Sequence, residues 1–421
     1  MKVLIITYYW PPAGGSGVQR WLKFAKYLKA YGVEPIIYTI DNPNYPKTDD
    51  SLLKEIPKDI MVLKKSIWEP TDLLFWKKNK IDDKGISNVS KGGLLSFIRG
   101  NFFIPDPKIF WVKPSVKFLQ SFLKSSEIDV IISTGPPHSM HLIAQKLHQK
   151  SKIKWIADFR DPWSDLYYNK DFNQFSFTKK RNRKLEKSVL QSSDCILTVS
   201  NTLKNEFSKI ANRVEVITNG FDNEVLSLKP NFLDNEFSIS YIGLLPQQSN
   251  PKTFLNVLKE ICLENTAFKK DLRLNLIGDI SDEVKREIEN NNLIENSNFI
   301  GYVHHQKAIK YQKKAQVLLL LIPNVEKSEG ILTGKLFEYL TANRPILALA
   351  PTQGDVSKVL KDTNTGEVIH FDDKVNLKTK VLELYQQYKS GKLVVKSNNI
   401  QQFHRKELTK QLATIIKSLH S

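Results

Sequence analysis

The sequence predicts an α/β protein made of two doubly wound domains, each a parallel sheet covered by helices on both faces. Three observations lead to this prediction. Short apolar runs rich in β-branched residues alternate with amphipathic segments of about 10–15 residues. The alternation occurs in two series, and no fixed-period repeat interrupts it. With 421 residues, the chain is long enough to bury two cores.

The first series runs from the first residue to about 220, and each apolar run is short enough to be a strand. Helices are expected where apolar residues recur at a helical spacing, at 20–32 and 138–150. The stretch at about 45–125 is basic and aromatic and shows no clear period. Strands are expected at 2–8, 34–40, 129–135, 154–159, 194–200 and 213–220.

The second series begins after a join near 220–235 and repeats the same alternation. Strands are expected at 237–243, 272–279, 299–303, 317–323, 345–351 and 366–371. Helices are expected at 250–265, 281–291, 305–315 and 334–344, with a final helix at 406–419 that could pack on either domain. We therefore expect domains at 1–220 and 221–399, followed by a terminal helical segment at 400–421.

The composition is that of an ordinary globular protein, with 41% hydrophobic and 25% charged residues. The longest apolar run, 317–322, ends at Pro323 and is far shorter than the ~20 residues that span a bilayer. The chain opens on the strand-like "MKVLII" without the features of a signal peptide. Cys195 and Cys262 are expected to be buried thiols. These features favour a cytoplasmic location.

The formal charge of +18 is unevenly distributed, with +13 in residues 1–200 and +5 in residues 201–421. A basic surface attracts nucleic acid, anionic lipid or phosphorylated small molecules. A solvated lysine-rich surface without a partner explains the charge equally well. No recognisable nucleic-acid-binding motif supports the first of these partners.

Three glycines lie between the first strand and the first helix, in "WPPAGGSGVQR" at 10–20. Exposed N–H groups of Gly14, Gly15 and Gly17, together with the helix dipole, would form an anion site. Arg20, one turn into the helix, would add a positive charge or simply face solvent. The spacing is not that of the dinucleotide-binding G-x-G-x-x-G, and a purely structural loop stays open.

Candidate reactive residues follow two further strands. His138 comes after the strand at 129–135, although a lone histidine is more often structural. Asp158, Arg160 and Asp161 cluster at the end of the strand at 154–159, among bulky neighbours. Arg160 suits phosphate or carboxylate binding, and either aspartate could orient a hydroxyl or act as a base. Ligands in open α/β sheets bind beyond the carboxyl ends of the strands, where these residues stand.

The most informative stretch of the second half is "SEGILTGKLFEYLTANRPILALA" at 328–350. On a helix, Lys335 and Glu338 share one face. Gly330 and Gly334 loosen the entry to that helix. Glu338 could accept two ribose hydroxyls while Lys335 meets a diphosphate. The alternative is an ordinary surface ion pair, worth a few tenths of a kcal/mol.

Taken together, these residues resemble the retaining glycosyltransferases of family 4, which have the GT-B fold. The likeness runs over nearly the whole chain and rests on order and spacing. Its motifs are "PPAGGSGVQR", "DCILTVSNTLKNEF", "VEVITNGFD", "ISYIG", "LNLIGD", "FIGYV" and "EGILTGKLFEYLTANRPILA". The resemblance implies two Rossmann-like domains facing a cleft, the first for the acceptor and the second for the donor. It also implies that the C-terminal helix packs back on the first domain.

The resemblance assigns roles to single residues. Glu338 matches the glutamate that holds the donor ribose, and the glycine loop matches the one under the donor phosphates. Tyr302 and Val303 fall where the nucleotide base is contacted, and Gly243 ends the donor-side strand "ISYIG".

Three positions depart from the family pattern. The glutamate expected near the transferred sugar is replaced by Gly330, with Glu329 one residue early. The basic pair expected after "YIG" is replaced by Leu244 and Ser249, which leaves the phosphate charge to Lys335 and Lys252. Arg160 stands where the family has a histidine.

The resemblance therefore implies transfer of a sugar, with retention, from a nucleotide-diphospho-sugar to an acceptor hydroxyl, with a weak preference for uracil. No cofactor or metal is expected, because the Asp-Asp pairs at 49–50, 82–83 and 372–373 lie in loop-like sequence. The basic-aromatic segment 64–124 favours a peripheral contact with an anionic membrane and a lipid-linked acceptor in cell-surface polysaccharide synthesis. An insertion that packs its aromatics inward explains that segment too. The alternatives are a nucleotide-sugar epimerase, a nucleic-acid-binding protein and an inactive relative.

Overall fold

The chain forms two compact units, each with its own sheet. A computed structural model describes residues 1–41, 43, 45, 48–67, 100–164, 174–227 and 232–420. Unit 1 comprises Met1–Thr218 and Arg405–Ser421, and unit 2 comprises Asn219–His404. The terminal helix α16 (Arg405–His420) therefore belongs to unit 1, where it contacts α1 (Ser16–Leu28).

The sheet of unit 1 has seven strands in the order β3-β2-β1-β4-β5-β6-β7, and all neighbouring strands are parallel. This is the doubly wound arrangement expected from the alternation of strands and helices. The strands are β1 (Lys2–Ile6), β2 (Glu34–Ile40), β3 (Met61–Lys65), β4 (Val130–Gly135), β5 (Lys154–Phe159), β6 (Cys195–Thr198) and β7 (Val214–Val216). The other helices are α4 (Ile109–Ser125), α5 (Ser139–Ser151), α6 (Ser176–Ser192), α7 (Asn201–Phe207), and the 3-10 turns η1 (Lys29–Tyr31) and η2 (Asp50–Glu55).

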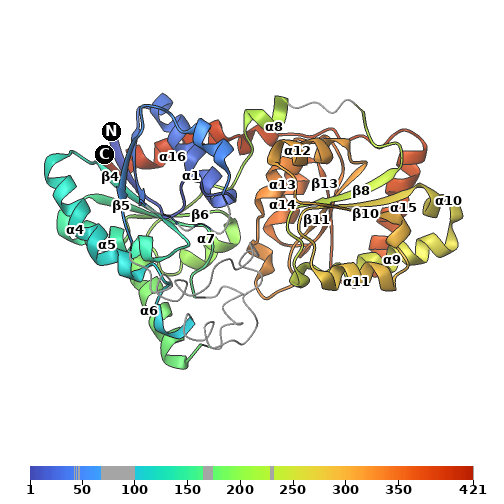
Figure 1. Cartoon of the computed structure of the whole chain (residues 1–421), viewed down its shortest axis with the longest axis horizontal. Coiled ribbons are helices and arrows are strands. Elements are labelled where there is room, and N and C mark those ends of the chain that lie inside the picture. Colours follow the sequence, from blue (N-terminus) through green and yellow to red (C-terminus); the bar gives the residue numbers. More distant parts are fainter. Residues whose placement is uncertain are drawn as a thin grey trace, which may run out of the picture. The chain divides into compact units, whose positions relative to one another are not determined.

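Alternate residues of the central strands supply two separate cores, one on each face of the sheet. On β1, Val3 and Ile5 join the core under α1 and α16, whereas Leu4 and Ile6 join the core under α4 and α5. Figure 1 shows these two helix pairs on opposite faces of the sheet of unit 1. Because both faces are covered, the strands are continuous apolar runs.

Helices α4, α6 and α7 of unit 1 were not expected from the sequence pattern. Helix α4 lies in the stretch at 45–125 and has Pro114 as its sixth residue, where proline removes a backbone hydrogen bond of the helix and so argues against a helix in the sequence. Helix α6 is so rich in basic residues that its apolar positions are few. Residues 68–99 of the basic-aromatic segment 64–124, and the aspartate pair at 82–83, lie outside the described residues.

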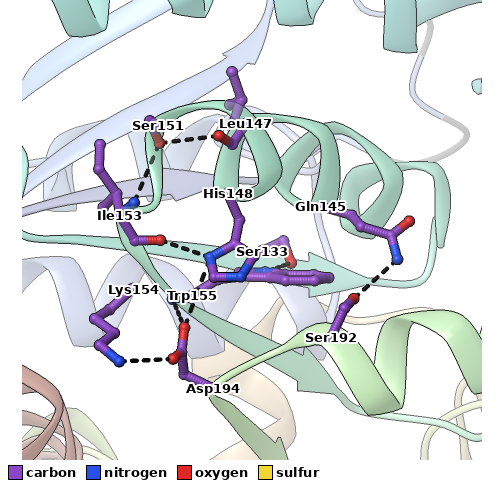
Figure 2. A network of polar contacts seen from close by, with 10 residues as sticks. All are labelled: Ser133, Gln145, Leu147, His148, Ser151, Ile153, Lys154, Trp155, Ser192 and Asp194. Carbon is purple, nitrogen blue, oxygen red and sulfur yellow. Dashed lines mark hydrogen bonds and ion pairs between the residues drawn. The ribbon is translucent and has the colours of Figure 1, made fainter.

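A polar network fastens α5 to the neighbouring strands (Figure 2). Asp194, just before β6, accepts hydrogen bonds from the backbone N–H of Trp155 (2.8 Å) and from Nζ of Lys154 (3.0 Å). His148 Nδ1 donates to the carbonyl of Ile153 (2.8 Å). Trp155 Nε1 donates to Ser133 Oγ (2.9 Å), which links β5 to β4. These bonds fix the strands whose carboxyl ends carry the candidate site.

Unit 2 contains a six-stranded parallel sheet in the order β10-β9-β8-β11-β12-β13. Its strands are β8 (Phe237–Ile242), β9 (Leu272–Ile277), β10 (Ser297–Gly301), β11 (Val317–Leu321), β12 (Ile346–Leu349) and β13 (Gly366–Ile369). Its helices are α8 (Asn223–Ser227), α9 (Lys252–Glu264), α10 (Thr266–Asp271), α11 (Asp282–Asn290), α12 (His305–Lys314), α13 (Gly334–Tyr339), α14 (Asp355–Thr363) and α15 (Lys374–Lys389). The 3-10 turns are η5 (Gln247–Ser249), η6 (Ile294–Asn296), η7 (Ser328–Gly330) and η8 (Ile400–Phe403).

Helices also cover both faces of the second sheet. One core packs α9, α10, α11 and α15 against the sheet, and the other packs α12, α13 and α14 (Figure 1). The predicted fold class, two doubly wound parallel-sheet domains, is therefore confirmed. Cys195 and Cys262 are buried free thiols, as expected. None of the helices within the described ranges is both long and apolar enough to cross a membrane.

Candidate functional site

Each sheet has one point at which the strand order reverses. The chain connections that follow the two neighbouring strands at this point leave in opposite directions. In unit 1 this point lies between β1 and β4, and in unit 2 it lies between β8 and β11. Loops that leave such strands in opposite directions open a crevice in which α/β proteins bind ligands. The candidate residues of the sequence follow these strands or their neighbours.

The glycine loop of unit 1 turns from β1 into α1. Gly15 is the residue that precedes the helix and has φ 107° and ψ 167°, a conformation essentially limited to glycine. Gly14 and Gly17 are partly buried, and Gly15 is exposed. The loop is therefore open at Gly15, at the N-terminus of a 13-residue helix.

Arg160 occupies the space beside Gly17. A Cβ at position 17 would lie 1.7 Å from Nη1 of Arg160. The guanidinium is held there by β4, because Nε donates to the carbonyl of Gly135 (3.1 Å) and Nη2 donates to that of Pro136 (2.5 Å). The structure thus brings the glycine loop and the strand-end arginine together and places a cation at the loop.

Arg20 and Asp158 do not lie where the sequence placed them. Both side chains are 0% exposed, and Arg20 Nη2 pairs with Asp158 Oδ1 at 3.0 Å. Nη1 of Arg20 donates to the carbonyls of Ile217 (2.8 Å) and Thr218 (2.9 Å). Neither residue can reach a ligand from this position, so the expected contact of Arg20 with phosphate, and a base role for Asp158, are corrected.

The second oxygen of Asp158 is also used internally. It accepts from Trp21 Nε1 and from Thr134 Oγ1, both at 2.8 Å. The carboxylate therefore joins α1, β4 and β5, and through Arg20 it joins the segment after β7. A buried ion pair with all these hydrogen bonds positions the glycine loop.

His138 is buried beneath the loop after β4. Its ring stacks on Trp163 with centroids 4.8 Å apart, and both ring nitrogens are buried without a hydrogen-bond partner among the described residues. Burial holds the pKa of His138 well below its ordinary value, and the neighbouring His141 and Arg160 lower it further. His138 is therefore neutral at physiological pH.

His141, one turn later on α5, is a neighbour that the sequence analysis missed. Burial, reinforced by Arg160, lowers its pKa to about 3. Its Nδ1 bonds Ser133 Oγ at 2.8 Å, and its ring stacks on Phe159 with centroids 4.5 Å apart. Ring nitrogens of both histidines face the bare α-carbon of Gly135. The i, i+3 spacing of two histidines after a strand was the available signal.

Asp161 is partly buried beside Arg160. Burial raises the pKa of this carboxyl; Arg160 opposes the shift and Asp158 adds to it. A carboxyl with a raised pKa next to a cation is a candidate for hydrogen bonding with a sugar hydroxyl. Among the sequence-predicted residues of unit 1, Gly17, His138, Arg160 and Asp161 therefore share one neighbourhood.

In unit 2, Lys335 of α13 lies against the carboxyl end of β8. Its Nζ donates to the hydroxyl of Tyr241 (2.6 Å) and lies 4.0 Å from the centroid of that ring. Tyr241 in turn donates to the carbonyl of Leu244 (2.6 Å). Burial lowers the pKa of Lys335 to about 7, although Glu338 favours its charged form. Lys335 therefore changes charge near neutral pH.

Gly243 gives Lys335 room. It follows β8 with φ 123°, and a Cβ there would lie 3.0 Å from Nζ of Lys335. Its N–H donates to the carbonyl of Ile277 (2.7 Å), at the end of the next strand. Gly243 thus lets an ammonium group approach the backbone at the strand end.

Glu338 faces α12 from one turn further along α13. Its Oε1 lies 2.8 Å from Nε2 of His305, and its Oε2 accepts from Nε2 of Gln312 (2.9 Å). An ionised carboxylate only accepts, so His305 carries its proton on Nε2. The side chain of Glu338 is 18% exposed, which leaves it reachable. Tyr241, His305 and Gln312 were missed; only the histidine pair after "FIGYV" signalled one of them.

The remaining donor-side candidates surround this cluster. Tyr302 follows β10 with 73% of its surface exposed, and Val303 is partly buried against the core under α13. Gly334 is the first residue of α13. Glu329 is exposed in η7, whose backbone packs against Gly354 at the start of α14. The placement of Glu329 near the transferred sugar stays a prediction.

No group of three His, Cys, Asp or Glu side chains that could hold a metal ion occurs among the residues that the structure covers. The expectation that transfer needs no metal or other cofactor stays a prediction.

The sequence matches two family models. "Glycosyltransferase Family 4" matches residues 87–225, and "Glycosyl transferases group 1" matches residues 236–387. Together the two matches span more than half of the chain. The chain belongs to glycosyltransferase family 4. In this glycosyltransferase the first match falls mostly in unit 1 and the second falls in unit 2. No sequence among the curated proteins matches it.

Solved structures show the same fold at low identity. The glycosyltransferase is similar to sucrose-phosphate synthase from Thermosynechococcus elongatus (TM-score 0.68, 13% identity, 99% and 98% of the two chains covered). It is also similar to Anabaena HepE in complex with UDP-glucose (0.65, 13%, 99% and 100%). A third similar structure is WaaG, a glycosyltransferase involved in lipopolysaccharide biosynthesis (0.58, 13%, 98% and 99%). The GT-B architecture expected from the sequence is confirmed.

Proposed function

We propose that this glycosyltransferase transfers a sugar from a nucleotide-diphospho-sugar to an acceptor hydroxyl, with retention at the anomeric carbon. The observation that carries the proposal is the placement of Lys335 and Glu338 on α13. Lys335 lies beside the end of β8, and Glu338 is hydrogen-bonded to α12. A lysine and a reachable carboxylate, three residues apart, supply a phosphate contact and a pair of hydroxyl acceptors. The match to the group 1 glycosyltransferases over unit 2 supports the assignment.

In this proposal Lys335 binds the donor diphosphate. A dianionic ligand beside Nζ favours the charged ammonium and offsets its desolvation. When the sugar leaves, negative charge develops on the diphosphate, and a cation already in place stabilises it more in the transition state than in the ground state. Gly243 keeps the approach to the ammonium open.

Glu338 binds the ribose through its two carboxylate oxygens. His305 and Gln312 orient these oxygens, so the carboxylate needs little reorganisation when the ribose binds. Tyr302 and Val303, at the end of β10, contact the nucleotide base, for which uracil is favoured. The similar structure of HepE holds UDP-glucose, which is consistent with a UDP-sugar.

Unit 1 supplies the acceptor side of the reaction and also the glycine loop, whose backbone at Gly14, Gly15 and Gly17 contacts the donor phosphates. Arg160 offers Nη1 at that loop, and Asp161 accepts from an acceptor hydroxyl. The neutral His138 packs against Trp163 in the same neighbourhood. From unit 2, Glu329 contacts the transferred sugar. Such a set positions substrates and stabilises charge without a dedicated base.

We propose further that the acceptor is a lipid-linked or growing saccharide of a cell-surface polysaccharide. The charge of +13 in residues 1–200 supports work at the inner, anionic face of the cytoplasmic membrane. The similar protein WaaG takes part in lipopolysaccharide biosynthesis, which is a surface pathway.

A donor screen tests this function. UDP-, GDP-, ADP- and dTDP-sugars are each incubated with and without a lipid-linked saccharide, and nucleotide diphosphate release is followed. We expect release from one UDP-sugar that depends on acceptor, and a product whose anomeric proton signal shows retention. Release without any acceptor, together with an altered sugar, would indicate an epimerase. No release from any donor would indicate an inactive relative.

A further inference from the structure

Exposed phenylalanines gather where α6 begins. Phe177 is 71% exposed and Phe102 is 68% exposed. The segments that carry them are bonded together, since Phe175 N–H donates to Asn101 Oδ1 (2.7 Å) and Gln174 Nε2 donates to the carbonyl of Gly100 (3.0 Å). Two large apolar side chains are therefore held in water by a fixed piece of backbone.

The rest of α6 is strongly basic at its exposed positions. Its buried positions, Thr178, Asn182, Val189 and Leu190, form one stripe at helical spacing. The single acid of the helix, Glu186, accepts from the backbone N–H groups of Trp163 (2.9 Å) and Ser164 (3.2 Å). The exposed positions include six cations, Lys179, Lys180, Arg181, Arg183, Lys184 and Lys187.

We propose that this surface, α6 together with Phe102, binds the face of an anionic phospholipid bilayer. The inference deepens the proposed function, on which it rests, by naming the surface of unit 1 that meets the membrane. Phenylalanines at one end would enter the boundary between head groups and acyl chains, while the lysines and arginines lie along the phosphates. The phenylalanines lie at one end of the surface and the basic residues lie along the rest of it, which favours a bilayer. Nucleic-acid bases stack on aromatic side chains that are placed between the cations.

Co-sedimentation of the full chain with vesicles tests the proposal. We expect binding to phosphatidylglycerol vesicles at low salt, weaker binding at high salt, and none to phosphatidylcholine alone. The triple variant Lys180→Glu/Arg183→Glu/Lys184→Glu should lower the partition coefficient at least about tenfold. Phe102→Ser/Phe177→Ser should lower it by about tenfold, since it removes the apolar part of the contact.

Matched variants in unit 2 serve as controls. Lys358→Glu/Lys361→Glu/Lys392→Glu makes the same charge change at exposed positions, and Leu263→Ser/Val375→Ser removes two exposed apolar side chains. Equal loss in the controls and in the α6 variants would overturn the proposal. Salt-sensitive binding to DNA, lost in the α6 charge variant while vesicle binding is kept, would also overturn it.

The proposed function and this surface fail separately. If the α6 variants lose vesicle binding but keep nucleotide release with a water-soluble acceptor, both stand. If the wild type releases nucleotide diphosphate but does not bind vesicles, the membrane surface is contradicted and the proposed function stands. Vesicle binding through α6 without release from any donor would remove the enzyme function and leave the surface in place.

Discussion

Nη1 of Arg160 lies 1.7 Å from the point where a Cβ on Gly17 would stand. The glycine at position 17 is therefore required by the arginine that follows β5, not by its own backbone conformation. This contact joins two motifs that are more than 140 residues apart in the sequence. It also gives a direct way to displace Arg160 without removing it.

Gly17→Ala should push the guanidinium of Arg160 away from the carbonyls of Gly135 and Pro136. Because the end of a flexible side chain can move, we expect little change in the free energy of unfolding. Misplacing a contact group lowers kcat/KM by about 10–100-fold, and we expect a loss of this size. Steady-state kinetics of nucleotide release and urea unfolding measure the two quantities.

A double-mutant cycle checks the cause. If Gly17→Ala acts by displacing Arg160, then adding Arg160→Ala to Gly17→Ala should lower kcat/KM only slightly further. Independent, additive losses would show that the two residues act separately. Gly15→Ala differs, because its φ of 107° makes alanine strained; that variant should lose about 1–3 kcal/mol of stability.

Asp158→Ala should destabilise unit 1 strongly. It leaves Arg20 as an uncompensated buried charge and frees the donors of Trp21 and Thr134. Breaking a buried pair from one side typically costs about 3–5 kcal/mol. Urea unfolding measures the change, and Asp59→Ala, which breaks the exposed pair with Lys29, is the control with little expected effect. A small change for Asp158→Ala would restore it as a candidate for chemistry.

Sequence reasoning found every strand except β3, which lies in the irregular basic-aromatic stretch, and it found the order of the candidate residues, but not which of them are accessible. Arg20 and Asp158 are both at helix or strand ends, as ligand-binding residues are, yet their side chains turn inward because each satisfies the other. The direction of a side chain depends on partners far along the chain, here Ile217 and Thr218. A period in the sequence carries no information on such partners.

The donor-side cluster was easier to predict, because Lys335 and Glu338 lie within one short motif. Their supporting residues come from β8 and α12, and only the packing of three elements brings them together. Helices α4 and α6 were missed for a different reason. Their proline and dense charge hide the helical period that reveals α1 and α9.

The neutral histidines of unit 1 should make the protein sensitive to acid. The folded-state pKa of His141, about 3, lies below the ordinary value of 6.5, so between these values the unfolded chain binds more protons. Stability is then lost as the pH falls from 6.5 toward 3, with a slope of up to about 1.4 kcal/mol per pH unit for one histidine.

His141→Phe removes that titration. The free energy of unfolding should therefore fall less steeply between pH 6 and pH 4 than in the wild type, because one proton fewer is taken up on unfolding. Urea midpoints at several pH values measure it. Met140→Leu, a buried neighbour on α5 that does not titrate, should shift stability equally at every pH. An unchanged slope in His141→Phe would contradict a neutral buried imidazole.

Donor binding should weaken with rising pH because of Lys335. Its pKa of about 7 means that the ammonium is lost just above neutrality, and a diphosphate binds the charged form. From pH 7 to pH 8.5 the affinity for UDP should fall about tenfold in the wild type. Titration calorimetry with UDP measures it.

Lys335→Met should bind UDP weakly and with little dependence on pH. The exposed Lys361→Met is the control and should behave as the wild type. In the absence of ligand, the sign for stability is opposite. The depressed pKa means that the unfolded chain binds more protons between 7 and 10.5, so stability rises with pH in that window and Lys335→Met removes the rise. A pH-independent UDP affinity in the wild type would contradict the role of Lys335.

The central claim is that Glu338 holds the donor for sugar transfer, and turnover of Glu338→Ala tests it most directly. Nucleotide diphosphate release from the preferred donor is compared in the wild type, in Glu338→Ala and in the exposed control Glu295→Ala, after circular dichroism shows that all three are folded. We expect Glu338→Ala to lower kcat/KM at least about 100-fold and Glu295→Ala to leave it unchanged. Release by Glu338→Ala at the wild-type rate would contradict the assignment of the site.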